Sequence, residues 1–134
     1  MTNPQNPAQQ KAAQDYKAIN LGSASKEELV VLLFEAAHRL QVKARIDIEA
    51  GREADARAHL RRVRDIFGEL VVSLDHSAAP EMTGNLARLY TWVINETSKA
   101  GLERSPEILD GTIRVTQMLM EGFTHAFRGP QEAP

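Results

Sequence analysis

The chain has 134 residues, which is enough for one domain with a real core but not for two. Its hydrophobic and charged fractions, 43% and 25%, are those of an ordinary soluble protein, and its formal net charge of −2 gives no reason to expect a nucleic acid or an anionic membrane as partner. Because there is no cysteine, disulfides, thiolate metal sites and cysteine nucleophiles are excluded. With no secretory signal at its start and no apolar run longer than residues 29–34, the protein is expected to be cytoplasmic, without insertion into a membrane.

Both ends of the chain are predicted to lie outside the fold. Residues 1–22 are mostly polar and contain prolines, so we expect a flexible N-terminal arm. Its large apolar side chains are those of Tyr16, Ile19 and Leu21. They form a short apolar segment that is a candidate partner contact. Residues 129–134 are predicted to be a disordered tail.

The first predicted helix covers residues 26–50 and is apolar on two sides. Ser25 and Glu28 have the spacing of a capping box, and Gly51 suits the left-handed turn that ends a helix. One apolar stripe is predicted to enter the core, and it consists of Leu29, Leu32, Leu33, Ala36, Ala37, Leu40 and Ala44. Val31 and Phe34 project nearly opposite Leu40, so we expect them at the surface. This surplus of apolar side chains indicates a helix that covers something besides its own bundle.

Three more amphipathic helices follow, over residues 53–74, over residues 81–100, and from residue 106 to near Gly129-Pro130. Pro80 suits the first turn of the third helix, Gly101 is predicted to end it, and Ser105 is predicted to cap the fourth. Glycines at 68, 111 and 122 lie inside helices, where close helix contact is the ordinary reason and a shallow place for another backbone is the alternative. The links are short and no segment alternates like a strand. The sequence therefore predicts an all-α fold, an antiparallel up-down-up-down four-helix bundle over residues 23–128.

No catalytic or metal-binding constellation is visible. Glu35 and His38 form one E-x-x-H step, but a di-iron bundle needs two such steps and two further glutamates. No nucleophile elbow and no phosphate-binding loop is present. We predict that the chain is not an enzyme and holds no cofactor or metal, and we keep a helical-bundle metal protein or enzyme as an alternative.

Five arginines fall within residues 52–64, accompanied by Glu53 and Asp55. A basic helix face is typical of RNA-binding modules or of proteins with an acidic partner. Nearby acids and the negative whole chain favour a solvated outer face instead, so an RNA-binding helical module is the second alternative.

Apolar residues off the core stripes are the candidates for a partner surface. Besides Val31 and Phe34, Trp92 sits to one side of the third helix's stripe. Val72 and Met118 also point away from their stripes. A contiguous patch of such residues marks a binding site, whereas isolated ones are normal. Val31, Phe34 and Trp92 are therefore predicted to bind a partner or to pack at the edge of the bundle.

A series of short segments resembles the FliS family, the flagellar secretion chaperones for flagellin. The residues that carry the resemblance are Tyr16, Leu21, Ser23-Ala24-Ser25, Glu27-Glu28-Leu29, Leu32-Leu33-Phe34, Arg64-Asp65-Ile66, Glu69-Leu70, Ser73-Leu74-Asp75, Asn85-Leu86, Leu89-Tyr90 and Ile108-Leu109. Together they cover most of residues 16–127 in the right order. Two departures are mild: Lys26 stands where the family usually has proline, and Phe34 where it usually has tyrosine.

The resemblance implies a cytoplasmic chaperone that binds the disordered C-terminal region of flagellin. Such a chaperone prevents premature polymerisation and accompanies the subunit to the flagellar export gate. The family's N-terminal arm is thought to lie over the binding surface through its tyrosine, a role that only Tyr16 carries here. The expected oligomeric state is a monomer or a weak homodimer.

Overall fold

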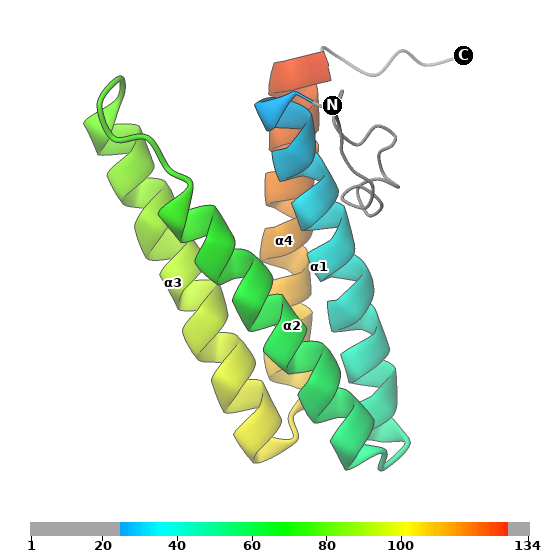
Figure 1. Ribbon diagram of the computed structural model, residues 1–134. Helices are drawn as coiled ribbons and strands as arrows, with labels where there is room; N and C mark the ends of the chain where they lie inside the picture. The colour runs from blue at the N-terminus through cyan, green and yellow to red at the C-terminus, as the bar shows by residue number, and fades with distance from the viewer. Residues whose placement is uncertain (1–24, 129–134) are drawn as a thin grey trace, which may run out of the picture. The chain divides into compact units, whose positions relative to one another are not determined.

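The computed structural model describes residues 25–128, and within this range every regular element is a helix (Figure 1). The helices are α1 (Lys26–Glu49), α2 (Glu53–Val72), α3 (Pro80–Glu103) and α4 (Pro106–Arg128). They confirm the predicted all-α fold and the order of its helices. The predicted arm and tail, with Tyr16, Ile19 and Leu21, lie outside the described residues.

Local sequence signals set three of the helix boundaries as predicted. The Ser25 side-chain oxygen accepts a hydrogen bond from the Glu28 amide at 3.1 Å, and the Ser105 oxygen accepts one from the Ile108 amide at 3.2 Å. Gly51, directly after α1, has a φ of 77°, in the region that glycine adopts without strain. The capping residues were therefore sufficient to place the start of α1, the start of α4 and the turn between α1 and α2.

The predicted end of the third helix is wrong. Instead of stopping before Gly101, α3 continues to Glu103 and is closed by Arg104, which has a φ of 51°. A Cβ atom on Gly101 would lie 3.3 Å from the Leu60 Cδ1 atom, tighter than most such contacts. Gly101 therefore allows α3 to approach α2 closely and does not end the helix.

The chain divides into two compact parts, one of residues 33–122 and one to which residues 25–32 and 123–128 belong. The first part contains most of each helix, and a buried cluster takes one residue from each of the four: Ala44, Leu60, Ala100 and Leu109. Within this part α2 and α3 lie side by side with opposite directions (Figure 1). A buried core that draws on all four helices therefore lies within residues 33–122.

Polar side chains join α1 to α4 inside the same part. The Gln41 Nε2 atom donates to the Thr116 hydroxyl oxygen at 2.9 Å, and both side chains are fully buried. Four residues along α1, the Arg45 guanidinium donates two hydrogen bonds to the Asp110 carboxylate, at 2.5 and 3.1 Å. The Arg45 hydrogen bonds hold the pKa of Asp110 below its ordinary value of 3.8. Two directional contacts therefore fix how these helices meet.

The second part includes the start of α1 and the end of α4. Here the Phe123 and Phe127 rings pack edge to face, with centroids 5.4 Å apart. Leu29 and Leu32, both predicted to enter the core, are each 39% exposed. Among the described residues, no helix combines the length and apolarity needed to cross a membrane.

Candidate partner-binding surface

The predicted exposure of Val31 and Phe34 is wrong, because both side chains are fully buried. The Phe34 ring packs against two other aromatic rings, with its centroid 6.3 Å from that of Phe67 and 6.1 Å from that of Tyr90. The Phe67 and Tyr90 rings meet edge to face at 5.8 Å. Phe34 thus belongs to an aromatic core that joins α1, α2 and α3.

The error has a physical cause in the composition of α1. This helix is the least amphipathic of the four, since leucines, valines, alanines and a phenylalanine occupy nearly all of its sides. Periodicity alone then does not decide which side faces the core. In the structure the buried side runs through Val31, Phe34, Ala37, Gln41 and Ala44. A large ring fills the core, and smaller side chains of the predicted stripe are left at the surface.

Burial of Tyr90 changes the acidity of its phenol. The side chain is 1% exposed, and this burial raises the pKa of Tyr90 to about 12. A neutral phenol is the form that tolerates an apolar site, because ionisation there would cost desolvation energy. The aromatic core is therefore kept uncharged at any physiological pH.

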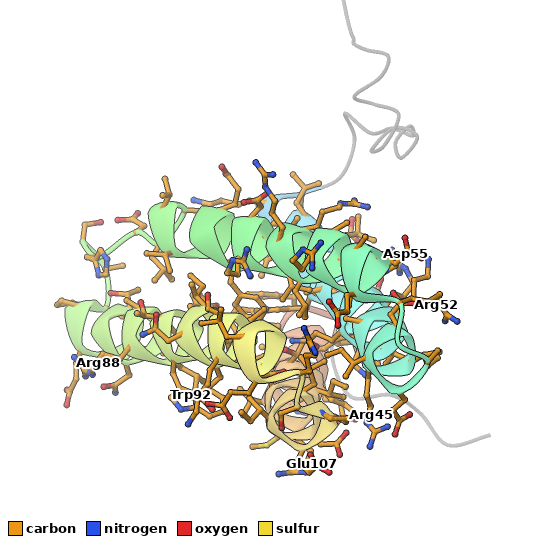
Figure 2. The ribbon with its side chains drawn as sticks, turned by 90° about the horizontal axis from the view of Figure 1, so that it is seen from below. Arg45, Arg52, Asp55, Arg88, Trp92 and Glu107 are labelled. Carbon is orange, nitrogen blue, oxygen red and sulfur yellow. The ribbon has the colours of Figure 1, made fainter. Side chains whose placement is uncertain are left out.

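Trp92 is the predicted site residue that the structure leaves at the surface. Its side chain is 40% exposed and points to the side of α3 away from α2 (Figure 2). A tryptophan that is partly exposed on a bundle surface is a common anchor for a partner. Of the three candidates on the helices, Trp92 alone has the exposure that partner binding needs.

Exposed apolar side chains occur on all four helices of residues 33–122. As predicted, Val72 and Met118 point outward, with 80% and 70% of their surface exposed. Four further exposed apolar residues were not predicted from the sequence, namely Val42 and Ile46 on α1 and Met82 and Leu102 on α3. The surplus of apolar surface is therefore real, but it is spread around the bundle and is not concentrated on α1.

A groove lies between α2 and α3 in this part. It consists of two adjoining cavities of about 250 and 530 Å³. Both are lined by Arg57, Leu60, Gly101 and Leu102. The floor of the groove lies where α3 approaches α2 at Gly101. The largely exposed side chain of Leu102 lies at its edge. We call this hollow the α2–α3 groove.

The walls of the α2–α3 groove are basic. Four arginines line it, namely Arg57, Arg61, Arg64 and Arg104, against one acid, Glu53. The Arg104 guanidinium pairs with Glu53 at 3.0 Å, and that of Arg57 lies 3.9 Å from the same carboxylate. Arg61 and Arg64 have no carboxylate partner within residues 25–128. The sequence showed these arginines, but it gave no sign of Leu102 beside them, because the helix was predicted to end earlier.

A buried carboxylate stabilises the turn between α1 and α2. Asp47 receives a hydrogen bond from the Arg52 Nε atom at 3.0 Å, and its other oxygen lies 2.8 Å from the His59 Nδ1 atom. Burial alone would raise the pKa of Asp47, but these two contacts outweigh it, and the pKa lies below its ordinary value of 3.8. Asp47 therefore stays ionised and holds the first residues of α2 against the end of α1.

The described residues offer no group of three or more histidine, aspartate or glutamate side chains that could hold a metal ion. Glu35 and His38 are both partly buried on α1. The structure therefore adds no ligands to the single E-x-x-H step.

The chain matches known proteins along most of its length. Residues 8–130 match the family described as flagellar protein FliS. The flagellar secretion chaperone FliS of Campylobacter jejuni is 29% identical over 109 residues, which cover 81% of this chain and 84% of that protein. The protein of the same name from Salmonella typhimurium is 29% identical over 89 residues, 66% of each chain.

A solved structure shares the fold. The crystal structure of a flagellar chaperone from bacteria superimposes with a TM-score of 0.74 and 20% sequence identity, over 92% of this chain and all of the other. The likeness confirms the predicted helical-bundle fold.

Proposed function

Since this chain belongs to the flagellar protein FliS family, we propose that it binds the disordered C-terminal region of flagellin in the cytoplasm, prevents its premature polymerisation and delivers it to the flagellar export apparatus. Family membership makes the chain a flagellar secretion chaperone and not an enzyme, as the sequence predicted. Beyond family membership, we propose that the client is flagellin, that its C-terminal region is the segment bound, that the compartment is the cytoplasm, and that delivery to the export apparatus follows.

The distribution of apolar surface is the observation that carries this proposal. Each helix of residues 33–122 keeps at least one large apolar side chain exposed, although the bundle core is already filled. A client segment that is disordered alone can lay amphipathic helices along such a surface, anchored at i, i+3 and i+4 positions. Part of the binding energy is spent on ordering the client, so contact with several helices is needed.

We place Trp92 in the client contact and keep the arm residues Tyr16, Ile19 and Leu21 as its proposed cover in the free protein. Val31 and Phe34 are fully buried, so we do not place them in the client contact. An arm that competes with the client lowers the apparent affinity by the fraction of covered molecules. Removing the arm is therefore expected to raise the affinity.

The test is a calorimetric titration of the purified chain with a flagellin C-terminal segment. We expect saturable binding with a negative heat-capacity change, as burial of apolar surface requires. A flagellin that lacks this segment is the control and should not bind. Deletion of residues 1–22, and Tyr16→Ala, should strengthen binding without changing helix content. Absence of binding by the segment would overturn the proposal, and unchanged affinity after deletion would remove the covering arm from it.

A further inference from the structure

We propose that the α2–α3 groove docks an acidic, amphipathic segment of a partner protein. An apolar side chain of that segment enters the hollow beside Leu60 and Leu102, and its carboxylates pair with Arg57, Arg61 and Arg64. The proposal goes beyond client binding at Trp92 and does not require that the client be flagellin.

The shape of the α2–α3 groove suits an apolar side chain. The two cavities, of about 250 and 530 Å³, share Leu60, Gly101 and Leu102 in their lining, so an apolar strip belongs to both. Leu102 is 87% exposed at the edge, where it gains little from the protein's own packing. Covering such a side chain is favourable in proportion to the apolar area removed from water. The groove is thus suited to an apolar anchor.

The charge of the α2–α3 groove suits an acidic segment. The lining carries four arginines and one glutamate, a net charge of +3 (four minus one), whereas the whole chain has a net charge of −2. Arg61 and Arg64, which lack carboxylate partners among the described residues, are free to form bidentate pairs with incoming acids. The positive charge is therefore concentrated where the hollow lies, and it selects a negative occupant.

The groove side of α2 continues beyond the arginines. From Arg64 onward, Gly68 and Val72 follow at steps of four residues, which keeps them on the same side of the helix. A Cβ atom on Gly68 would meet nothing within 4 Å, and Val72 is largely exposed. From Arg57 to Val72 the helix rises roughly 22 Å. This length matches an occupant helix of about four turns.

The observations favour a protein segment over a nucleic acid. Proteins that bind single-stranded nucleic acids stack bases on aromatic side chains, and none of the residues lining the groove is aromatic. Isoleucine, leucine, alanine and glycine supply the apolar floor instead. Such a floor receives an aliphatic side chain and offers nothing specific to a base or a sugar.

The experiment uses a fluorescein-labelled, 16-residue synthetic peptide with leucines on one helical side and glutamates flanking them. Its affinity for the full chain is measured by fluorescence anisotropy, beside an analogue with glutamine in place of every glutamate. We expect the glutamine analogue to bind at least about tenfold more weakly, a difference of roughly 1.4 kcal/mol. Equal affinity of the two peptides would overturn the proposal.

Adjacent arginines on α2 provide a matched control. Arg61→Glu and Arg62→Glu change the net charge equally, but Arg61 lines the groove and Arg62 does not. We expect Arg61→Glu and Leu102→Ser to weaken binding of the acidic peptide at least about fivefold and Arg62→Glu to leave it within about twofold. All three positions are exposed, so circular dichroism should show unchanged helix content.

Three outcomes decide against the groove. If Arg61→Glu and Arg62→Glu weakened binding of the acidic peptide equally, net charge alone would explain the loss of affinity. Retained binding with Leu102→Ser would remove the apolar anchor. A 16-nucleotide uridine RNA that binds more tightly than the peptide, and loses binding with Arg61→Glu, would make a nucleic acid the occupant.

Discussion

The two edges of the exposed face of α3 differ in chemistry. Leu102 stands beside α2, in a groove whose walls carry arginines. Trp92 points away from α2 (Figure 2); one turn before it lies Arg88, which donates to the Asn85 side chain, and one turn after it lies Glu96. One edge therefore offers an apolar anchor among several arginines, and the other a large ring flanked by one arginine and one glutamate. The two proposed contacts on α3 therefore differ in the partner chemistry that each would accept.

The aromatic core packs beneath the helices that carry both proposed contacts. Phe34→Ala should therefore have the largest effect on stability and on both affinities. Removing a fully buried phenylalanine costs about 3–5 kcal/mol of unfolding free energy, because a cavity replaces the ring. Denaturation by urea measures this loss, and affinity for the flagellin segment and for the acidic peptide should fall together. Val72→Ala is the control, since that side chain is mostly exposed and a change within about 0.5 kcal/mol is expected. A small loss for Phe34→Ala would contradict the placement of its ring in the core.

Charge introduced at each edge should separate the two surfaces. Trp92→Glu is expected to weaken binding of the flagellin segment at least about tenfold, because large aromatic anchors dominate such interfaces. The same variant should leave the affinity for the acidic peptide nearly unchanged. Leu102→Glu should do the reverse. The measurement is a crossed set of titrations, and equal losses of both ligands in both variants would mean that α3 has one continuous binding surface.

Two glycines provide a finer test of the groove floor. Gly68→Ala meets open space, so the higher helix propensity of alanine should stabilise the protein by about 0.5–1 kcal/mol. Gly101→Ala should gain less, because its new Cβ atom would lie 3.3 Å from the Leu60 side chain, which must move. Thermal unfolding of the two variants compares them directly. An equal gain at both positions would show that α3 does not approach α2 as closely as described.

Acid should weaken the turn beside the groove by the smallest amount. Because the pKa of Asp47 is lower in the folded chain than its ordinary value of 3.8, its contribution to stability is complete above about pH 4. The contribution is lost as the pH falls from there through the folded pKa. Unfolding temperatures measured from pH 6 to pH 2 should therefore fall less steeply for Asp47→Asn than for the natural chain. Parallel curves would show that Asp47 binds protons equally in both states.

Much of the fold could be predicted because its signals are local. Ser25, Ser105 and Gly51 act through the backbone groups next to them, and the structure confirms all three. Gly101 and Gly68 show the limit of such reasoning. The reason for Gly101 is a leucine on another helix, and close contact, the ordinary reason for a helical glycine, is wrong at Gly68.

The candidate site could be predicted only in part. Trp92 was identified because it lies off a clear stripe, whereas Val31 and Phe34 lie on a helix that has no clear stripe. The α2–α3 groove could not be predicted, because it depends on which two helices pair and on the extra turn of α3. The periodicity of the sequence indicates neither. The roles of Tyr16, Ile19 and Leu21 remain predictions from resemblance to the family.

The contacts between α1 and α4 bear on which helices move when a partner binds. The buried amide of Gln41 has a partner for its nitrogen but none for its oxygen among the described residues, and it still faces Thr116. Hydrogen bonds lose strength quickly when their geometry changes, whereas apolar contacts lose little when helices slide slightly. No buried hydrogen bond joins α2 to α3 in the part of the chain described. We therefore expect the α1–α4 pair to keep its alignment while α2 and α3 shift to admit a guest and return when it leaves.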